Sequence, residues 1–224
     1  MKKNCSLCNG NIFTVVFSRM ILDTYNVEIF KCQNCGFIYS DIAIDELELH
    51  KFISEKYYQT KKGAFQIDQR FVRHYTRRAY SHIKLFSKLF KINFDGCVLD
   101  VGCGAGLFLN EMKKGGWKTF GIEPSCECFD YATTVLNLDI YRGLFDEYQT
   151  NEKFDLVYFS HSFDDLPNIV RVLKKINNLL NDTGKIFIEV PNSNRDTNFN
   201  SVKDGDFIEN RYYFTPSTLR HLVE

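Results

Sequence analysis

The sequence lacks a net charge, because Lys and Arg together number 28 and so do Asp and Glu. This balance excludes a protein that coats nucleic acid or an anionic membrane through overall charge, although it leaves room for a local basic patch. No apolar run approaches the length of a membrane span, and the start MKKNCSLCNG has no apolar signal core. The sequence therefore predicts a cytoplasmic protein without a membrane partner.

Internal repeats and low-complexity tracts are also lacking, so none interrupts the pattern of strands and helices described below. A length of 224 residues with 44% hydrophobic residues suits one globular domain plus a small module. We expect a zinc ribbon over residues 1–40, a helical linker and cofactor-covering segment over 41–96, and the main domain over 97–224.

Eight cysteines are present, and the first four form two C-x2-C pairs, which are Cys5 and Cys8, then Cys32 and Cys35. Residues 9–31 between the pairs are enough for a hairpin, and FTVVFSRM and VEIFKC read as its strands. Each pair is followed by turn residues, Asn9-Gly10 and Gly36. Four thiolates at this spacing favour structural Zn²⁺ in a reducing compartment. Two disulfides or four unligated thiols are the alternatives.

The linker carries helical signals and a local excess of arginine. Residues 41–66 predict a short helix and a connecting segment, and apolar residues between Val72 and Phe90 recur at helical spacing. Arginines lie off that apolar face, at Arg70, Arg73, Arg77 and Arg78. They form either a solvated helix face, which we favour, or a basic rim for a phosphorylated substrate.

From residue 97 onward, strand and helix patterns alternate. The strands are CVLDVG, KTFGIEP, DIYRG, FDLVYFS and KIFIEVP, and an amphipathic helix ending at NDTG precedes the last of them. This order predicts an α/β fold: a doubly wound, mainly parallel, Rossmann-like sheet of five strands with helices on both faces, and a small N-terminal zinc ribbon.

A cluster of glycines follows the first strand, in VLDVGCGAG. Glycines in the first strand-to-helix turn let a ligand approach the main chain, and the following helix start favours negative charge. Alone, such a turn is also consistent with plain chain reversal. Asp100 closes the first strand and Glu123 the second, where a carboxylate can accept hydrogen bonds from two ribose hydroxyls. The glycine turn and the carboxylate at the strand end together indicate a binding site for a nucleoside.

VLDVGCGAG followed by GIEPS resembles the cofactor motifs of class I S-adenosylmethionine (SAM) methyltransferases over residues 97–191. The resemblance implies that the glycines contact the methionine part of SAM, that Glu123 binds the ribose, and that Asp100 orients the turn or the amino group. GLFDE would lie at the adenine, and FSHSFDDLPN beside the sulfonium and the acceptor. The implied cofactor-binding residues are Asp100, Gly102, Cys103, Gly104, Gly106, Glu123, Pro124, Leu144, Phe145 and Ser160.

The four-cysteine ribbon ahead of such a domain is similar to bacterial methyltransferases of sugar and surface-glycan pathways, including nucleotide-sugar C-methyltransferases. That likeness implies a tyrosine segment closing over the cofactor, here Tyr57 and Tyr58. YYFTPSTLRHLV also resembles an element that leads into two further strands in the group. Since the sequence stops at Glu224, we expect either a missing C-terminal half or a shortened chain.

The acceptor side of the reaction is less defined. Where many relatives have Glu-His after the fourth strand, this chain has Asp164-Asp165, so His161 is the best local candidate for a general base. A structural histidine is an equal alternative, and one aspartate is expected to cap the helix near Pro167. Glu189 and Asn192 flank the fifth strand's end, and the polar segment after Asn192 is expected to form a substrate loop.

The sequence therefore predicts a SAM-dependent methyltransferase that releases S-adenosylhomocysteine (SAH) and acts on a small polar acceptor, with a sugar nucleotide or surface-polysaccharide precursor favoured. A nucleic-acid methyltransferase is disfavoured by the neutral charge and by the lack of an Asn-Pro-Pro-aromatic sequence after the fourth strand. A non-catalytic SAM-binding partner and a dehydrogenase are further alternatives, although the G-x-G-x-G spacing disfavours the dehydrogenase.

Overall fold

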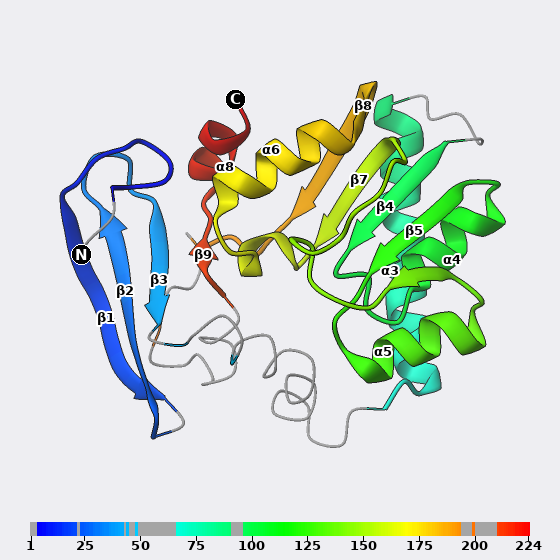
Figure 1. Cartoon of the computed structure of the whole chain (residues 1–224), viewed down its shortest axis with the longest axis horizontal. Helices are drawn as coiled ribbons and strands as arrows, with labels where there is room; N and C mark the ends of the chain where they lie inside the picture. The colour runs from blue at the N-terminus through cyan, green and yellow to red at the C-terminus, as the bar shows by residue number, and fades with distance from the viewer. Residues whose placement is uncertain are drawn as a thin grey trace. The chain divides into compact units, whose positions relative to one another are not determined.

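The computed structural model describes residues 4–21, 23–42, 44, 48, 66–90, 96–193, 199 and 210–224 (Figure 1). The chain divides into two compact units, each built from separate stretches of sequence. The ribbon unit comprises Met1–Lys51, His161–Lys175 and Glu189–Glu224, and the sheet unit comprises Phe52–Ser160 and Ile176–Ile188. The predicted helix within residues 41–66 and the predicted substrate loop fall mostly outside the described residues.

The sheet unit contains a five-stranded sheet in the order β6-β5-β4-β7-β8 (Figure 1). Its strands are β4 (Cys97–Val101), β5 (Lys118–Ile122), β6 (Asp139–Tyr141), β7 (Phe154–Ser160) and β8 (Leu180–Glu189). β4 pairs in parallel with β5 and β7, and β5 with β6. Numbered along the sheet this is 3-2-1-4-5, the doubly wound order, which confirms the predicted fold and puts the topological switch point beside β4.

Helices cover the sheet because each buries one apolar stripe against it. α4 (Leu107–Lys114) joins β4 to β5, and α5 (Cys126–Asp130) continues as a π-helical turn (Tyr131–Val135) before β6. The predicted helix of the linker is α3 (Gln69–Phe90), which buries Ala79, His82 and Phe86. His82 Nδ1 lies 2.6 Å from Tyr158 Oη on β7, and the Tyr158 ring stacks between Phe108 and Phe187.

The fifth strand begins earlier than the sequence predicts. α6 (Ile169–Leu179) runs directly into β8, so NDTG belongs to the strand rather than to a separate turn. Asn181 Nδ2 donates to Asp155 Oδ1 over 2.8 Å. A Cβ on Gly184 would lie 2.7 Å from the Phe154 carbonyl oxygen. These contacts hold the polar residues of NDTG alongside β7. The residues therefore lie in a strand, although their local propensity favours a turn.

The ribbon unit contains an antiparallel sheet in the order β1-β2-β3-β9. β1 (Phe13–Ile21) and β2 (Tyr25–Cys32) form the predicted hairpin, β3 (Ile38–Ile42) follows the second cysteine pair, and β9 (Tyr212–Tyr213) adds an edge. α8 (Pro216–Val223) begins with a capping box between Thr215 and Thr218. Among the described helices, none is both long and apolar enough to cross a membrane.

Candidate functional site

The turn between β4 and α4 is built from glycines in the left-handed region. The φ angles are 74° at Gly102, 54° at Gly104 and 73° at Gly106, a conformation that L side chains rarely adopt. At Gly106 a Cβ would also lie 2.6 Å from Leu138 Cδ1. The N–H groups of Gly102 and Cys103 both donate to the Ile122 carbonyl at the end of β5, over 2.9 and 3.0 Å. The turn is therefore fastened to the neighbouring strand.

Glu123 lies at that same end of β5 and is only 4% exposed. Its Oε2 accepts from the Gly104 N–H over 2.7 Å, and its Oε1 accepts from the Ser125 N–H over 2.9 Å. A carboxylate oxygen can accept up to two hydrogen bonds. Ser125, which sequence reasoning did not single out, fixes this orientation through its backbone. The sequence does carry a signal for this residue, because serine is a preferred N-cap residue and Ser125 is the N-cap of α5.

Asp100, at the end of β4, is 2% exposed. Its Oδ1 is buried and has no hydrogen-bond partner within the described residues. Burial, with a smaller contribution from the negative charge of Glu123, raises the pKa of Asp100 well above its usual value. Burial also raises the pKa of the Cys103 thiol well above its usual value, with further contributions from Asp100, Glu123 and Cys128. The turn thus lies beside two buried carboxyl groups, and one oxygen of the Asp100 carboxyl has no partner among the described residues.

The other predicted cofactor residues occupy the ends of neighbouring strands. Pro124 is half-buried after Glu123, and Ser160 is the half-buried last residue of β7. The Leu144 N–H donates to Glu147 Oε2 over 3.0 Å, which orders the predicted adenine segment. Phe145 is 2% exposed, with its ring centroid 6.1 Å from that of Phe159. Tyr58 lies outside the described residues, as does Tyr57.

His161, Asp164 and Asp165 belong to the ribbon unit. His161 is exposed and has a φ of 58°, which a non-glycine residue rarely adopts. Its N–H donates to the Glu189 carbonyl over 2.8 Å. Asp164 and Asp165 lie in a 3₁₀ turn (Phe163–Asp165), and Asp164 is buried.

The predicted aspartate cap of α6 is wrong. Asn168 takes that place, because its Oδ1 accepts from the Arg171 N–H over 3.3 Å. The two aspartates precede it in the 3₁₀ turn.

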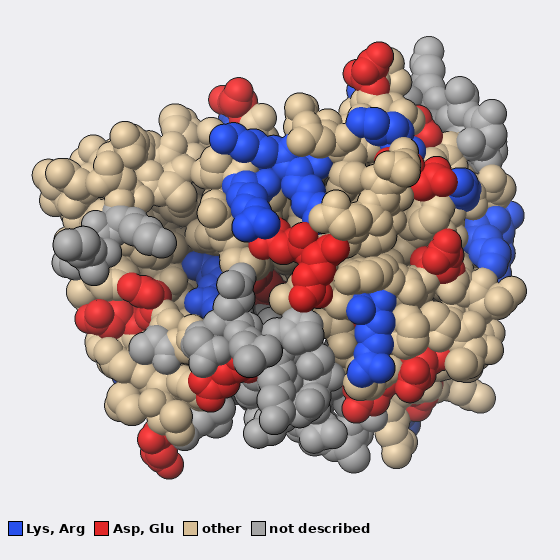
Figure 2. Space-filling view, viewed as in Figure 1, with Lys and Arg blue, Asp and Glu red and all other residues tan. Residues whose placement is uncertain are grey.

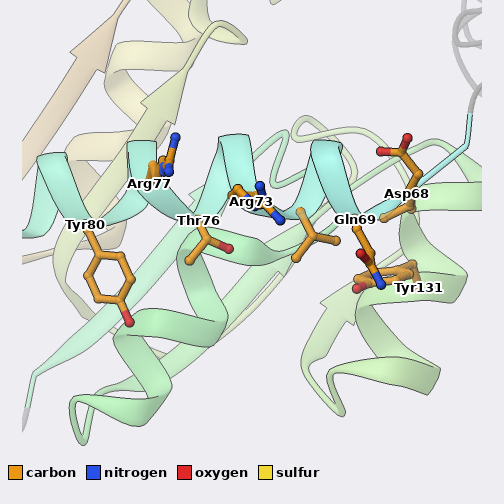
Figure 3. Close-up of a pocket in the computed structure, with 9 residues that line it drawn as sticks. Asp68, Gln69, Arg73, Thr76, Arg77, Tyr80 and Tyr131 are labelled. Carbon is orange, nitrogen blue, oxygen red and sulfur yellow. The ribbon is translucent and has the colours of Figure 1, made fainter.

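A groove of about 580 Å³ runs along α3 in the sheet unit (Figure 3). Gln69, Thr76 and Tyr80 project from one side of the helix, with Tyr131 of the π-helical turn near Gln69. Arg73 and Arg77 also line the groove. Both arginines are exposed, as a solvated face predicts, but the groove also leaves the predicted basic rim open as an alternative.

The four N-terminal cysteines converge in the ribbon unit. Their Sγ atoms all lie within 4.8 Å of one another, with Cys5 and Cys35 3.7 Å apart and Cys8 and Cys32 3.6 Å apart. All four are free thiols, so the disulfide alternative is wrong. Burial raises the pKa of Cys32, but hydrogen bonds with the N–H groups of Cys35 and Asn34 and with the Cys8 and Cys35 thiols together lower it to about 7. Thiolates about 2.3 Å from one zinc ion would lie about 3.8 Å apart, close to these separations.

Comparison with known proteins gives one family match, to a model described as "Methyltransferase domain", over residues 71–224. The ubiquinone biosynthesis O-methyltransferase of Actinobacillus pleuropneumoniae is 27% identical over 42% of this chain and 45% of its own length. The (S)-coclaurine N-methyltransferase of Papaver somniferum is 29% identical over 48% of this chain and 33% of its own length. The chain thus matches less than half the length of either relative.

Two solved structures share the fold. The plantazolicin methyltransferase BpumL in complex with SAH has a TM-score of 0.54 and 19% identity, covering 79% of this chain and 76% of that one. The plantazolicin methyltransferase BamL, in complex with a triazolic desmethylPZN analogue and SAH, has a TM-score of 0.53 and 19% identity, covering 66% of this chain and 60% of that one.

Proposed function

Because the chain belongs to the methyltransferase-domain family, we propose that it is a SAM-dependent methyltransferase that releases SAH. The observation that carries the proposal is the pair of buried carboxyl groups, Asp100 and Glu123, at the glycine turn. SAM offers a methionine ammonium group and two ribose hydroxyls, which are donors that a pair of carboxyl groups can accept from.

The residues fit this cofactor in chemical type. Asp100 Oδ1, which has no partner in the described part of the chain, would accept from the methionine ammonium, and a cation there would offset the energetic cost of burying a carboxylate. Glu123 would accept from the ribose hydroxyls while the N–H groups of Gly104 and Ser125 hold its carboxylate in place. We assign the methionine part to the glycine turn with Cys103, the adenine to the segment with Leu144 and Phe145, and further contacts to Pro124, Ser160 and Tyr58.

When bound, SAM supplies a methyl group activated on a sulfonium, so the chain must orient an acceptor and remove its proton. We propose that His161, which directly follows β7, is the general base, with Asp164 and Asp165 orienting it or binding an acceptor hydroxyl. The left-handed backbone at His161 supports a functional role, because strained non-glycine residues cluster at active sites.

Replacing His161 with Asn is expected to lower methyl transfer by about 100-fold or more, since general-base catalysis contributes about 10²–10⁴-fold. Asn tolerates the left-handed region, so the fold and SAH affinity should be retained. SAH release from SAM and calorimetric SAH binding are measured on the same protein, with His221→Asn on α8 as the control. Unchanged turnover would remove His161 from the mechanism.

We further propose a small polar acceptor, with a sugar nucleotide or surface-polysaccharide precursor favoured. Acidic side chains lie between the basic ones on the face in Figure 2, which supports a small acceptor over a nucleic acid. The test is SAH release from SAM with nucleotide sugars, free sugars, a tRNA pool and no acceptor. Turnover with tRNA alone would favour the nucleic-acid alternative, and SAH binding without turnover on any acceptor would favour a non-catalytic partner.

We propose that the four N-terminal cysteines bind a structural zinc ion. Four thiolate ligands leave no open position for a substrate, so the ion would stabilise a small sheet rather than take part in catalysis. Such a site requires reduced thiols, so the zinc proposal is consistent with the proposed cytoplasmic location, where thiols stay reduced.

Replacing Cys32 with Ser is expected to remove bound zinc and to loosen the ribbon sheet. Cys32 leads into Phe37, whose ring is fully buried and stacks on Tyr212 of β9 at a centroid distance of 5.6 Å. We expect one zinc ion per wild-type chain by elemental analysis, and faster hydrogen exchange in β2 and β3 of the variant. SAH affinity should change less than about twofold. Cys97→Ser is the control, and equal zinc content in the two variants would contradict the assignment.

A further inference from the structure

The ribbon sheet places two polar side chains opposite each other near its β9 edge. β3 and β9 pair Ile38 with Tyr213 and Tyr39 with Tyr212, so the next position in register brings Ser40 opposite Arg211. The Ser40 N–H donates to the Arg211 carbonyl over 2.9 Å, which confirms that they face each other. Opposed residues of an antiparallel pair project to the same face with Cβ atoms about 5 Å apart.

The Ser40 side chain is buried and Arg211 is half-buried, and each has a buried polar atom without a hydrogen-bond partner among the described residues. Ser40 is 8% exposed, and its Oγ has no partner within the described residues. The Nε of Arg211 is likewise buried without a partner in that part of the chain. On the same face, the cross-strand neighbour of Ser40 is Ile29, which is fully buried. An apolar surrounding makes two unsatisfied donors costly, so a ligand that accepts from both would stabilise this face.

The charge of Arg211 is also incompletely compensated. Burial lowers the pKa of its guanidinium, and nearby Tyr212, Asp41 and Asp165 act in the opposite direction. Asp41 follows Ser40 in β3, so its side chain projects to the other face of the sheet. A half-buried cation whose pKa stays lowered in spite of these nearby charges favours binding a further negative group.

Arg211 is tied directly to the proposed acceptor side. Its N–H donates to the Asp164 carbonyl over 2.9 Å, within the same unit. The Phe163 and Phe214 rings, with centroids 5.8 Å apart, pack the same two segments together. The position of Arg211 is therefore coupled to the 3₁₀ turn that carries Asp164 and Asp165.

We propose that Arg211 and Ser40 bind an oxyanion, the carboxylate or phosphate of the methyl acceptor. The guanidinium donates to the oxyanion and the Ser40 hydroxyl adds a second, neutral hydrogen bond. This inference rests on the proposed function for the identity of the acceptor, and it narrows that acceptor to an anionic molecule.

The test compares the thermal stability of wild type, Arg211→Met and Ser40→Ala in chloride, inorganic phosphate and glucuronate at constant ionic strength. Wild type should gain Tm with phosphate or glucuronate, and whichever anion gives the gain identifies the group bound. Arg211→Met should lose the gain while its Tm in chloride equals or exceeds that of wild type, because the change removes a half-buried cation whose Nε has no partner among the described residues. Ser40→Ala should reduce the gain, which keeps the proposal testable should Arg211→Met fail to fold.

The control is Arg73→Gln with Arg77→Gln in the α3 groove, which should leave the gain intact. Loss of the gain in this control, or its full retention in Arg211→Met or Ser40→Ala, would overturn the proposal. So would the absence of any gain in wild type. SAH titration of the same samples distinguishes failure of the anion proposal from failure of the methyltransferase proposal. If the methyltransferase proposal is wrong, the wild-type protein does not bind SAH, whereas the effect of the anions on Tm can still be measured.

Discussion

Replacing Glu123 with alanine is expected to weaken SAH binding by at least about 100-fold. The change removes the acceptor for the proposed ribose hydroxyls and also the carboxylate that holds the N–H groups of Gly104 and Ser125. Hydrogen bonds to a charged group contribute about 1.5–3 kcal/mol each, and each 1.4 kcal/mol is tenfold in affinity. Two lost bonds therefore account for about a 100-fold loss, and the freed glycine turn adds to it.

Calorimetric titration with SAH measures this effect, and two variants sharpen it. Glu123→Gln keeps one carbonyl acceptor but turns an amide N–H toward a backbone donor, so its affinity should fall between wild type and Glu123→Ala. Glu152→Ala removes a carboxylate from the same unit that pairs with Lys118, at the other end of β5, and should bind SAH normally. Equal affinities of Glu123→Ala and wild type would show that the ribose assignment is wrong.

Replacing Asp100 with Asn is expected to weaken SAH binding while raising the Tm of the ligand-free protein. The folded-state pKa of Asp100 is well above its unfolded value, because burial and Glu123 disfavour the carboxylate. The folded chain therefore holds a proton that the unfolded chain releases, and stability falls as the pH rises above about 3.9 toward the folded-state pKa. Asn removes that pH-dependent cost but cannot offer a charge to the methionine ammonium.

The same argument fixes the pH dependence of binding. An ammonium group beside Asp100 favours the ionised carboxyl, so SAH binding should release a proton and strengthen as the pH rises. Titrations in buffers of different ionisation enthalpy measure the released proton, and Asp100→Asn should abolish it. If the variant bound SAH like wild type, the ammonium assignment would fail, and a lowered Tm would make Asp100 a structural residue instead.

The sequence predicts the fold and the glycine turn well because their determinants are local. VLDVGCGAG contains the strand, the left-handed turn and Asp100 in one run, and the next strand ends at Glu123. The alternation of strands and helices then leaves few topologies, of which the observed sheet order is the usual one. The cysteine spacing is equally local, and the four Sγ atoms do converge.

Features that depend on distant pairing could not be predicted in this way. Ser40 and Arg211 are opposed only because β9 joins a sheet whose other strands lie near the N-terminus, and neither residue carries a local signal. The early start of β8 follows from contacts with β7 rather than from the turn residues NDTG. The cap at Asn168 similarly follows from the 3₁₀ turn that precedes it, which places the aspartates elsewhere.

The most direct measurement is calorimetric titration of the wild-type protein with SAH and, separately, with NAD. The account predicts one SAH site per chain with proton release on binding, and no heat with NAD under the same conditions. Binding of NAD in place of SAH, or of neither, would contradict the assignment of Asp100 and Glu123 to a SAM site.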